Sequence, residues 1–209
     1  MKRRSFLIGA PLALAACGGP PEVWSPDADL ARVRYVHDGP PALTLVSMLN
    51  VGSNHGAHSA LLINADERVL WDPAGSFHHP AIPERHDVLY GFSPRVFDLY
   101  VSYHSRQTYY TLIQRIEVPA AVAAQAKIEA ENYGPVPKLF CANATSKILR
   151  RLPGFQTIRQ TMTPDRLLKD FGELPGVVTR QHREDDEDDK SFALIRMDEQ
   201  LRLAVQSQQ

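Results

Sequence analysis

Cys141 has the most distinctive chemistry in this sequence. It opens a predicted helix at residues 140–152, because Pro135 and Pro137 disfavour helical structure before Phe140. A thiol is a useful nucleophile only as the thiolate, and a helix N-terminus or a neighbouring imidazolium lowers its pKa. Cys141 also falls on the apolar face of this helix, so a buried and unreactive thiol is the alternative interpretation.

A cysteine nucleophile needs a base, and we predict His58 for that role. His58 begins a predicted buried strand, residues 58–64, directly after a loop that contains Gly52 and Gly56. An imidazole at the mouth of a rigid strand can accept a proton from a thiol. A partly buried histidine without a catalytic role is the alternative. The weaker candidates stand in loop-like or charged segments: His37, His78, His79, His86, His104 and His182.

A third group should orient the imidazole, and the sequence favours Asp72. The segments 58–64 and 67–72 are predicted to form an antiparallel hairpin about Ala65. Residues whose numbers sum to 130 then lie opposite each other, which makes His58 and Asp72 a direct cross-strand pair.

A different loop length would change this pairing. An even number of loop residues gives a sum of 131 and turns Asp72 to the other face of the hairpin. Asn64 and His55 are the reserve candidates for that case. Asp72 also precedes Pro73, a context that is equally typical of a turn.

The elements that must position these residues follow from hydrophobic periodicity and from the Pro or Ser-Pro residues that are typical of the beginning of a helix. The expected strands are 43–49, 58–64, 67–72 and 108–118, and the expected helices are 93–104, 119–133, 140–152 and 163–171. This order predicts an α+β fold in which an antiparallel sheet packs against helices. Cys141 then stands at a helix N-terminus.

Residues 1–16 have the pattern of an export signal. A basic start at residues 2–4 precedes an apolar stretch of 11 residues, Phe6 to Ala16. That length suits a signal peptide and is too short for a membrane span. The stretch ends in Leu-Ala-Ala followed by Cys17, which resembles a bacterial lipobox, where the cysteine carries a lipid such as palmitate. The sequence RRSFL at residues 3–7 also resembles a twin-arginine export signal.

Lipidation of Cys17 would leave Cys141 as a lone thiol. The sequence contains two cysteines, so no partner remains for an intrachain disulfide. Exported proteins usually pair their cysteines, and an unpaired one suggests a reactive or deeply buried thiol. Gly18 resembles the residue found in lipoproteins sent to the outer membrane. We therefore expect a lipid-anchored protein on the periplasmic side of a bacterial envelope.

Composition limits the partners of the protein. The 209 residues are 44% hydrophobic with a formal net charge of −1, which is ordinary for a folded globular chain. No block of Lys and Arg beyond residues 2–4 could neutralise a row of phosphates, so nucleic-acid binding is not expected. No apolar run reaches the ~18–20 residues that span a bilayer. We expect contact with the membrane through the N-terminal lipid, and no cofactor.

The chain divides into four expected parts. Residues 1–16 are a signal peptide, residues 17–41 a proline-containing tether, residues 42–180 the folded domain, and residues 181–209 an acidic linker with a C-terminal segment. The acidic run at residues 184–189 lacks the alternating ligands and central glycine of a calcium loop. It is therefore expected to be a solvated linker.

The region of about residues 42–175 resembles the circularly permuted papain-like fold. The resemblance is carried by the segments GAHSALLI and FCANATSKILRRL. This group includes relatives of the NlpC peptidases and the lecithin retinol acyltransferases. In the permuted arrangement the His precedes the Cys, as here, where 83 residues separate His58 from Cys141. The order of these segments, with Tyr100 to Arg106 between them, more narrowly resembles bacterial periplasmic domains of the Lnb N-terminal type.

The resemblance implies that Cys141 attacks a carbonyl while His58 takes its proton. The backbone amide at the helix start would then stabilise the oxyanion. This chemistry serves amide hydrolysis, ester hydrolysis and acyl transfer, and an envelope location implies peptidoglycan peptides, lipids or lipoproteins as substrates. Two residues depart from the pattern. Phe140 stands where such families often carry Asn, and the third catalytic residue of the NlpC group commonly lies nearer the His than Asp72 does.

Two other functions stay open. A non-catalytic envelope binding or scaffold lipoprotein could use the same fold with a degraded site, because fold alone does not imply function. A metal site is the third possibility, and its candidate ligands are His55, His58, His78, His79 and His86. Their spacing does not match the usual ligand patterns, so no metal is expected.

Overall fold

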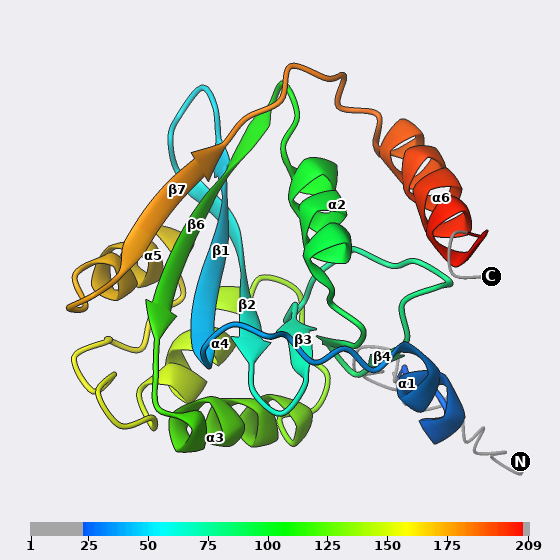
Figure 1. The fold of residues 1–209 in the computed structure, drawn as a ribbon. Helices are drawn as coiled ribbons and strands as arrows, with labels where there is room; N and C mark the ends of the chain where they lie inside the picture. Colours follow the sequence, from blue (N-terminus) through cyan, green and yellow to red (C-terminus); the bar gives the residue numbers. More distant parts are fainter. Residues whose placement is uncertain (1–22, 207–209) are drawn as a thin grey trace, which may run out of the picture.

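The computed structural model describes residues 23–206 of the chain. The expected signal peptide at residues 1–16 and the expected lipid attachment site at Cys17 lie outside the described residues. Within the described part, the protein has an α+β fold with a seven-stranded antiparallel sheet and six helices (Figure 1). The prediction of an antiparallel sheet packed against helices is confirmed.

Every pair of neighbouring strands is antiparallel, and the strand order is β4-β5-β3-β2-β1-β6-β7. The strands are β1 (Ala42–Asn50), β2 (Gly56–Asn64), β3 (Arg68–Trp71), β4 (Glu84–Arg85), β5 (Val88–Leu89), β6 (Tyr109–Glu117) and β7 (Val178–His182). β1 lies between β2 and β6. Its long apolar run is buried on both faces because helices cover both sides of the sheet.

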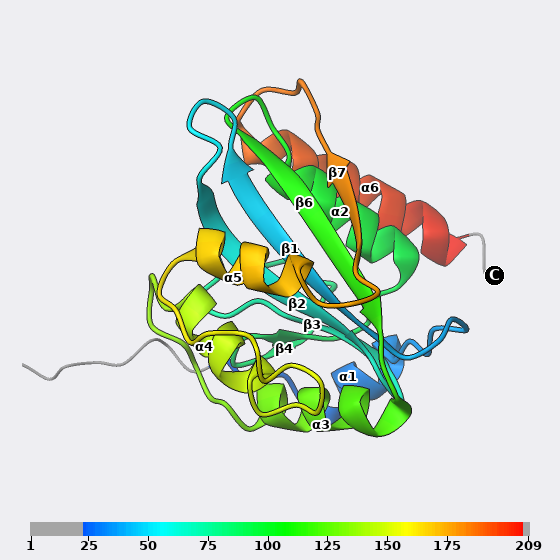
Figure 2. The same ribbon diagram turned by 90° about the vertical axis from the view of Figure 1, so that its left-hand side faces the viewer.

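The helices form two layers around the sheet (Figures 1 and 2). The helices of one layer are α3 (Ala120–Glu131), α4 (Cys141–Leu149) and α5 (Pro164–Gly172). The helices of the other layer are α2 (Pro94–His104) and α6 (Lys190–Gln206). The short helix α1 (Asp27–Val33) lies near β4 at the end of the sheet.

Strand alternation divides the core into two clusters. Leu43 and Leu45 of β1 pack toward α3, α4 and α5, whereas Val46 and Met48 pack toward α2. Successive side chains of a strand point to opposite faces, so one strand supplies both clusters. α6 adds Met197 to the cluster on the α2 side.

The hairpin of β2 and β3 has a register that differs from the expected one. Leu61 pairs with Trp71, so residues that lie opposite each other sum to 132 rather than to 130 or 131. Continued one position beyond β3, this register sets Asp72 opposite Ala60. Asp72 is then a diagonal neighbour of His58 on the same face, not its direct cross-strand partner.

Residues 23–41 were expected to belong to a tether, but they are attached to the sheet. The backbone amide of Ser25 donates to the carbonyl of Glu84 at 2.9 Å, and the amide of Arg68 donates to the carbonyl of Tyr35 at 2.8 Å. These bonds pair backbone groups at the sheet margin that would otherwise need water. This stretch is therefore part of the folded domain.

The acidic run at residues 184–189 is largely exposed to solvent, but it is bound to the fold and does not act as a free linker. The buried guanidinium of Arg106 donates to Asp186 at 2.8 Å, and the backbone amide of Thr108 donates to Asp188 at 3.0 Å. The buried positive charge of Arg106 offsets the repulsion within the run. These contacts hold the start of α6 against the sheet.

The expected end of the domain also changes. The boundary after residue 180 falls inside β7, which pairs with β6. Beyond the acidic run, α6 packs on the α2 side of the core through Ala193 and Met197. The C-terminal segment is therefore helical and belongs to the same core.

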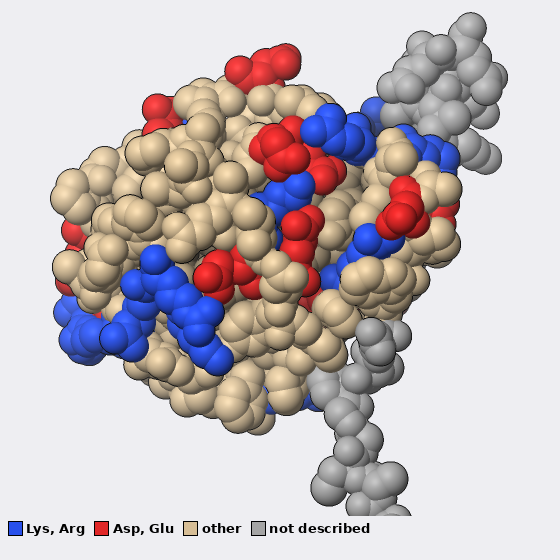
Figure 3. All heavy atoms as spheres, turned by 90° about the horizontal axis from the view of Figure 1, so that it is seen from below, with Lys and Arg blue, Asp and Glu red and all other residues tan. Residues whose placement is uncertain are grey.

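No helix among residues 23–206 is long and apolar enough to cross a membrane. On the face that Figure 3 shows, acidic and basic side chains are interspersed near the centre, and one group of basic side chains gathers near an edge. This face has no extensive surface of a single charge of the kind that a long polyanion needs.

Candidate active site

His58 and Asp72 form a hydrogen-bonded pair where β2 begins and β3 ends. Nε2 of His58 lies 2.6 Å from Oδ1 of Asp72. The side chain of Asp72 is 4% exposed and that of His58 18%, so the pair is largely shielded from water. The amide of Asp72 donates to the carbonyl of Asp87 at 2.8 Å, which holds the backbone that carries the carboxylate. The predicted pairing of His58 with Asp72 is present, although its register differs.

Two further residues shape the surroundings of the Asp72 carboxylate. The hydroxyl of Tyr100, on α2, donates to Oδ1 of Asp72 at 3.0 Å. Gly75 closes the turn after β3, and its amide donates to the carbonyl of Asp72 at 2.9 Å. A Cβ atom at position 75 would collide with the Asp72 carboxylate. Glycine at this position therefore gives the carboxylate its room.

His104 packs beside His58 as a neutral ring. The two ring centroids are 6.5 Å apart, and Nδ1 of His104 donates to the carbonyl of Tyr100 at 2.8 Å. Burial lowers the pKa of His104 to about 3, and the positive charges of His58 and Lys190 act in the same direction. His104 was among the weaker sequence candidates. The signal that could have raised its rank is its spacing of four from Tyr100, which places both on one face of α2.

Cys141 is the first residue of α4, and that helix packs against β2. Burial raises the pKa of the Cys141 thiol, but the hydrogen bond and charge of His58 outweigh burial and lower it below its ordinary value. The backbone amides of Ser59 and Ala142 act in the same direction. Because Asp72 occupies Nε2 of His58, Nδ1 is the ring nitrogen left for the thiol.

The three groups stabilise one another as a charged series. Burial alone would lower the pKa of His58, but the charge and hydrogen bond of Asp72, together with Cys141, raise it to about 10. Burial would raise the pKa of Asp72, but the charge and hydrogen bond of His58 lower it. At neutral pH this arrangement favours an imidazolium between a carboxylate and a thiolate.

The start of α4 is suited to stabilising negative charge. Phe140 occupies the N-cap position and supplies no side-chain acceptor for the first amides of the helix. These amides and the helix dipole therefore stay available beside the sulfur of Cys141. Leu139 has a φ of +72°, a conformation that is strained for a non-glycine residue and that clusters at functional sites.

A pocket of about 280 Å³ adjoins the His58 side of this site. His58 and His104 line it together with Gly75, Tyr109 and Lys190. Lys190 is the first residue of α6, so the C-terminal segment contributes directly to the wall of the pocket. The pocket offers room for a small group of a substrate next to the imidazole.

The two reserve candidates for the orienting role are engaged elsewhere. Nδ1 of the exposed His55 lies 3.1 Å from Oδ2 of Asp165 on α5. The side-chain amide of Asn64 donates to the carbonyl of Pro40 at 2.8 Å, at the other end of β2. Of the three candidates, Asp72 is the one with a hydrogen bond to His58 among the described residues.

Among residues 23–206, no group of three or more His, Cys, Asp and Glu side chains is placed to hold a metal ion. Two of the histidines considered as ligands pair singly with carboxylates instead. His78 lies 2.8 Å from Glu84, and His79 lies 3.0 Å from Asp198. Such isolated pairs lack the number of ligands that a metal site needs.

Comparisons with protein-family models, with curated proteins and with solved structures return no significant match.

Proposed function

We propose that this protein is a cysteine-dependent hydrolase or acyltransferase of the bacterial cell envelope, with a circularly permuted papain-like domain. The observation that carries the proposal is the series Cys141, His58 and Asp72, in which each group interacts with the next. An inert thiol in apolar surroundings has a raised pKa. The pKa of Cys141 is lowered instead, which supports a nucleophile rather than a buried structural thiol.

In the first step, the thiolate of Cys141 attacks the carbonyl carbon of an amide or ester, and the carbonyl electron pair moves to oxygen. Backbone amides at the start of α4, including that of Cys141, stabilise this oxyanion. When the intermediate collapses, the imidazolium of His58 gives its proton to the leaving amine or alcohol. A thioester on Cys141 and a neutral His58 remain.

In the second step, neutral His58 takes a proton from the incoming nucleophile as that nucleophile attacks the thioester. Collapse of the second intermediate releases the acyl product and regenerates the thiolate and imidazolium. Asp72 orients the ring and stabilises its charge without itself being protonated. Water as the nucleophile makes the protein a hydrolase, whereas an alcohol or amine makes it an acyltransferase.

The approach to the nucleophile favours a substrate with an apolar group. Leu139 is 83% exposed and Phe140 is 43% exposed, directly before Cys141 in the chain. Adjacent exposed apolar side chains commonly mark a binding surface. Together with the expected lipid anchor at Cys17, this apolar rim favours lipid or lipoprotein acyl groups over highly polar peptides.

The order of the elements supports the permuted papain-like interpretation. His58 lies on a strand of an antiparallel sheet, and the helix that begins with Cys141 follows it in the chain and packs back onto the same strand. The departure at Phe140 has a physical counterpart. An Asn at position 140 could hydrogen-bond the first backbone amides of α4 with its side chain. Phe140 has no such acceptor, so these amides remain to stabilise an oxyanion.

The proposal is tested by trapping the acyl-enzyme. The full chain carrying Cys17→Ser is mixed with p-nitrophenyl esters of short and long fatty acids, and release of p-nitrophenol is followed with the mass of the protein. We expect a burst of about one equivalent and an acyl group on the peptide that contains Cys141. Cys141→Ser and His58→Ala should abolish the burst, whereas His55→Ala should keep it.

A non-catalytic binding lipoprotein is the alternative. It would show no acyl adduct on Cys141 with any ester, and the same slow background hydrolysis in the Cys141→Ser variant. That result would overturn the enzymatic proposal.

A further inference from the structure

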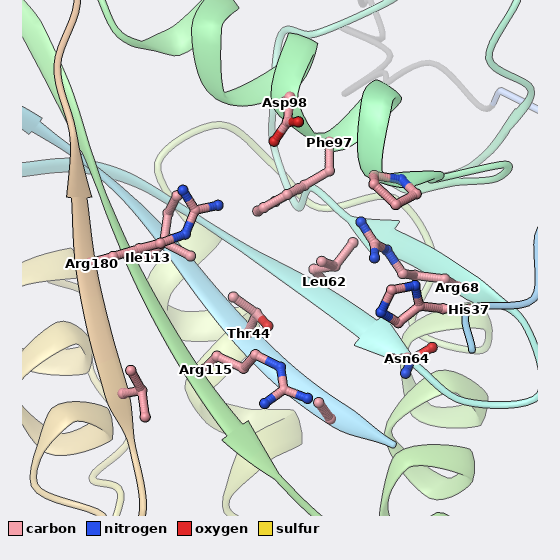
Figure 4. Close-up of a pocket in the computed structure, with 13 residues that line it drawn as sticks. His37, Thr44, Leu62, Asn64, Arg68, Phe97, Asp98, Ile113, Arg115 and Arg180 are labelled. Carbon is pink, nitrogen blue, oxygen red and sulfur yellow. The ribbon is translucent and has the colours of Figure 1, made fainter. Parts of the chain in front are cut away.

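A second pocket lies on the α2 face of the sheet, at the end of the strands remote from His58 (Figure 4). Its volume is about 410 Å³, which is within the range of small-molecule sites. Asn64 of β2 lines it, and the six positions between His58 and Asn64 correspond to roughly 20 Å along a strand. This pocket is therefore separate from the Cys141 site.

The floor of the pocket consists of two adjacent rows of cross-strand neighbours. One row is Arg68, Asn64 and Ala42, and the other is Leu62, Thr44 and Arg115. Ala42 and Thr44 occupy the middle of the sheet, and their small side chains leave the space open. Phe97 and Asp98 of α2 form the opposite wall.

Arg68 is a buried cation that forms no ion pair among the described residues, although the charge of Asp98 across the pocket acts on it. It is 6% exposed, and its guanidinium makes no hydrogen bond or ion pair within residues 23–206. Its nearest described aromatic neighbours are the rings of Tyr35 and Phe97, whose centroids are 5.9 and 5.6 Å from its Cζ. Burying an unpaired charge is costly, so natural proteins bury one where a partner binds. Figure 4 shows the guanidinium of Arg68 in this pocket.

Other polar groups around the pocket have the same preference for an anion. Arg115 and Arg180 also line it, whereas Asp98 is the one acidic residue among its lining residues. Arg115 is half-buried and donates to Glu117 at 2.9 Å, so part of its charge is already balanced. Burial and the charge of Arg68 lower the pKa of His37, which keeps that ring neutral and able to donate one hydrogen bond.

The lining also includes the large buried apolar side chains of Leu62, Phe97 and Ile113. We propose that this pocket binds a small amphiphilic anion, with its carboxylate or phosphate group on Arg68 and its apolar part along these three side chains. A planar guanidinium forms two parallel hydrogen bonds to either group. The site does not depend on the chemistry of Cys141.

The test measures binding of four probes to the full chain by calorimetry and by thermal unfolding. Decanoate and decyl phosphate carry both features of the ligand, decanol lacks the charge, and inorganic phosphate lacks the apolar part. We expect decanoate or decyl phosphate to bind and to raise the midpoint of thermal unfolding. Decanol and inorganic phosphate should each bind at least about tenfold more weakly than the better amphiphile.

Three variants identify the site. Arg68→Met should weaken amphiphile binding at least about tenfold and should raise the thermal midpoint of the free protein, because an unpaired buried charge is removed. Arg115→Gln, at a half-buried position, should weaken binding without unfolding the protein. Arg150→Gln removes an exposed cation of a distant surface and should change neither quantity.

The outcomes separate this site from the thiol chemistry. Cys141→Ala should bind the amphiphile as the unsubstituted chain does. The proposal is overturned if decanol or inorganic phosphate binds as tightly as the better amphiphile, if Arg68→Met binds that amphiphile as tightly as the unsubstituted chain does, or if no probe binds. Preference for decyl phosphate over decanoate would identify the anionic group as a phosphate, and the reverse preference would identify a carboxylate.

Discussion

Nε2 of His58 lies 2.6 Å from Oδ1 of Asp72, and this contact joins the beginning of β2 to the turn after β3. It selects one orientation of the imidazole. With Nε2–H donated to the carboxylate, Nδ1 is the ring nitrogen that remains for a second partner. The interaction of His58 with Cys141 lowers the pKa of that thiol.

Asp72→Asn should make the thiolate form of Cys141 less favourable without removing the hydrogen-bond acceptor for His58. The neutral amide keeps an oxygen near Nε2 but no longer stabilises the imidazolium, so the pKa of His58 falls and that of Cys141 rises. We expect the pKa of the thiol to rise by about one unit or more. The pH dependence of alkylation measures it, and an unchanged profile would show that Asp72 plays no part in activating the thiol.

Tyr100→Phe should destabilise the protein and loosen the Asp72 carboxylate. The change removes the donor to a buried acceptor, which costs about 1–3 kcal/mol in the free energy of unfolding. Tyr103→Phe is the matched control, because the hydroxyl of Tyr103 makes no hydrogen bond to a described residue. Urea unfolding of both variants checks the difference. Equal losses would mean that the bond from Tyr100 to Asp72 contributes nothing specific.

Gly75→Ala should impair the site through a steric effect. The added Cβ would collide with the Asp72 carboxylate and move it away from His58. We expect the Cys141 thiol to titrate near the ordinary value for cysteine in this variant. Gly52→Ala is the control, since its Cβ would meet only Asn50 at 3.4 Å. If Gly75→Ala leaves the titration of the thiol unchanged, the proposed crowding is absent.

The stability contributed by His58 should decrease at alkaline pH. Its pKa is about 10 in the fold against an ordinary value of 6.5, so the folded state binds the proton more tightly. The contribution is complete below pH 6.5 and is lost as the pH rises through about 10.

His58→Gln tests this pH dependence. In a Cys141→Ala background no thiol titrates in the same range, and of the two groups only Asp72 is left to raise the pKa of His58. The stability advantage of His58 over Gln should then shrink as the pH rises above 6.5. The decrease should be at most about 5 kcal/mol. Unfolding by urea at several pH values measures it, and an advantage independent of pH would contradict the raised pKa.

Asp186→Asn should release the C-terminal segment from the fold. The Arg106 side chain is 3% exposed, and without Asp186 its nearest carboxylate would be that of Glu184, at 3.7 Å. We expect a lower free energy of unfolding and faster amide exchange in α6. Lys190 lines the pocket beside His58, so reactivity of Cys141 should change as well. Asp189→Asn, whose carboxylate accepts only from the amide of Ser191, should have little effect.

The sequence predicts the elements of the site better than their register. Apolar periodicity locates β1, β2 and β6 within a few residues. Together with proline residues near the beginnings of helices, it also locates α2 to α5. The position of Asp72 depends on the hairpin loop, because Asn64 pairs with Arg68 and the loop therefore has three residues. A shift by two positions keeps Asp72 on the face of His58, so the pairing is correct even though the assumed register was not.

Features that depend on contacts between distant segments could not be read from the sequence. The acidic run has the composition of a solvated linker, and only its contact with Arg106, some 80 residues earlier in the chain, makes it part of the fold. The pocket of Arg68 arises where rows from four strands meet. Arg68 and Arg115 are ordinary strand residues in the sequence, and their common face becomes visible only with the register.

The most direct test of the nucleophilic site is the rate at which iodoacetamide alkylates Cys141 as a function of pH. The full chain with Cys17→Ser has Cys141 as its one thiol, and it is compared with the same chain carrying His58→Ala or, as a control, His55→Ala. We predict a plateau well below the ordinary thiol pKa of ~8.5, lost in His58→Ala and kept in His55→Ala. An inert thiol, or one that titrates near ~8.5 whatever residue occupies position 58, would contradict the Cys141–His58 pair.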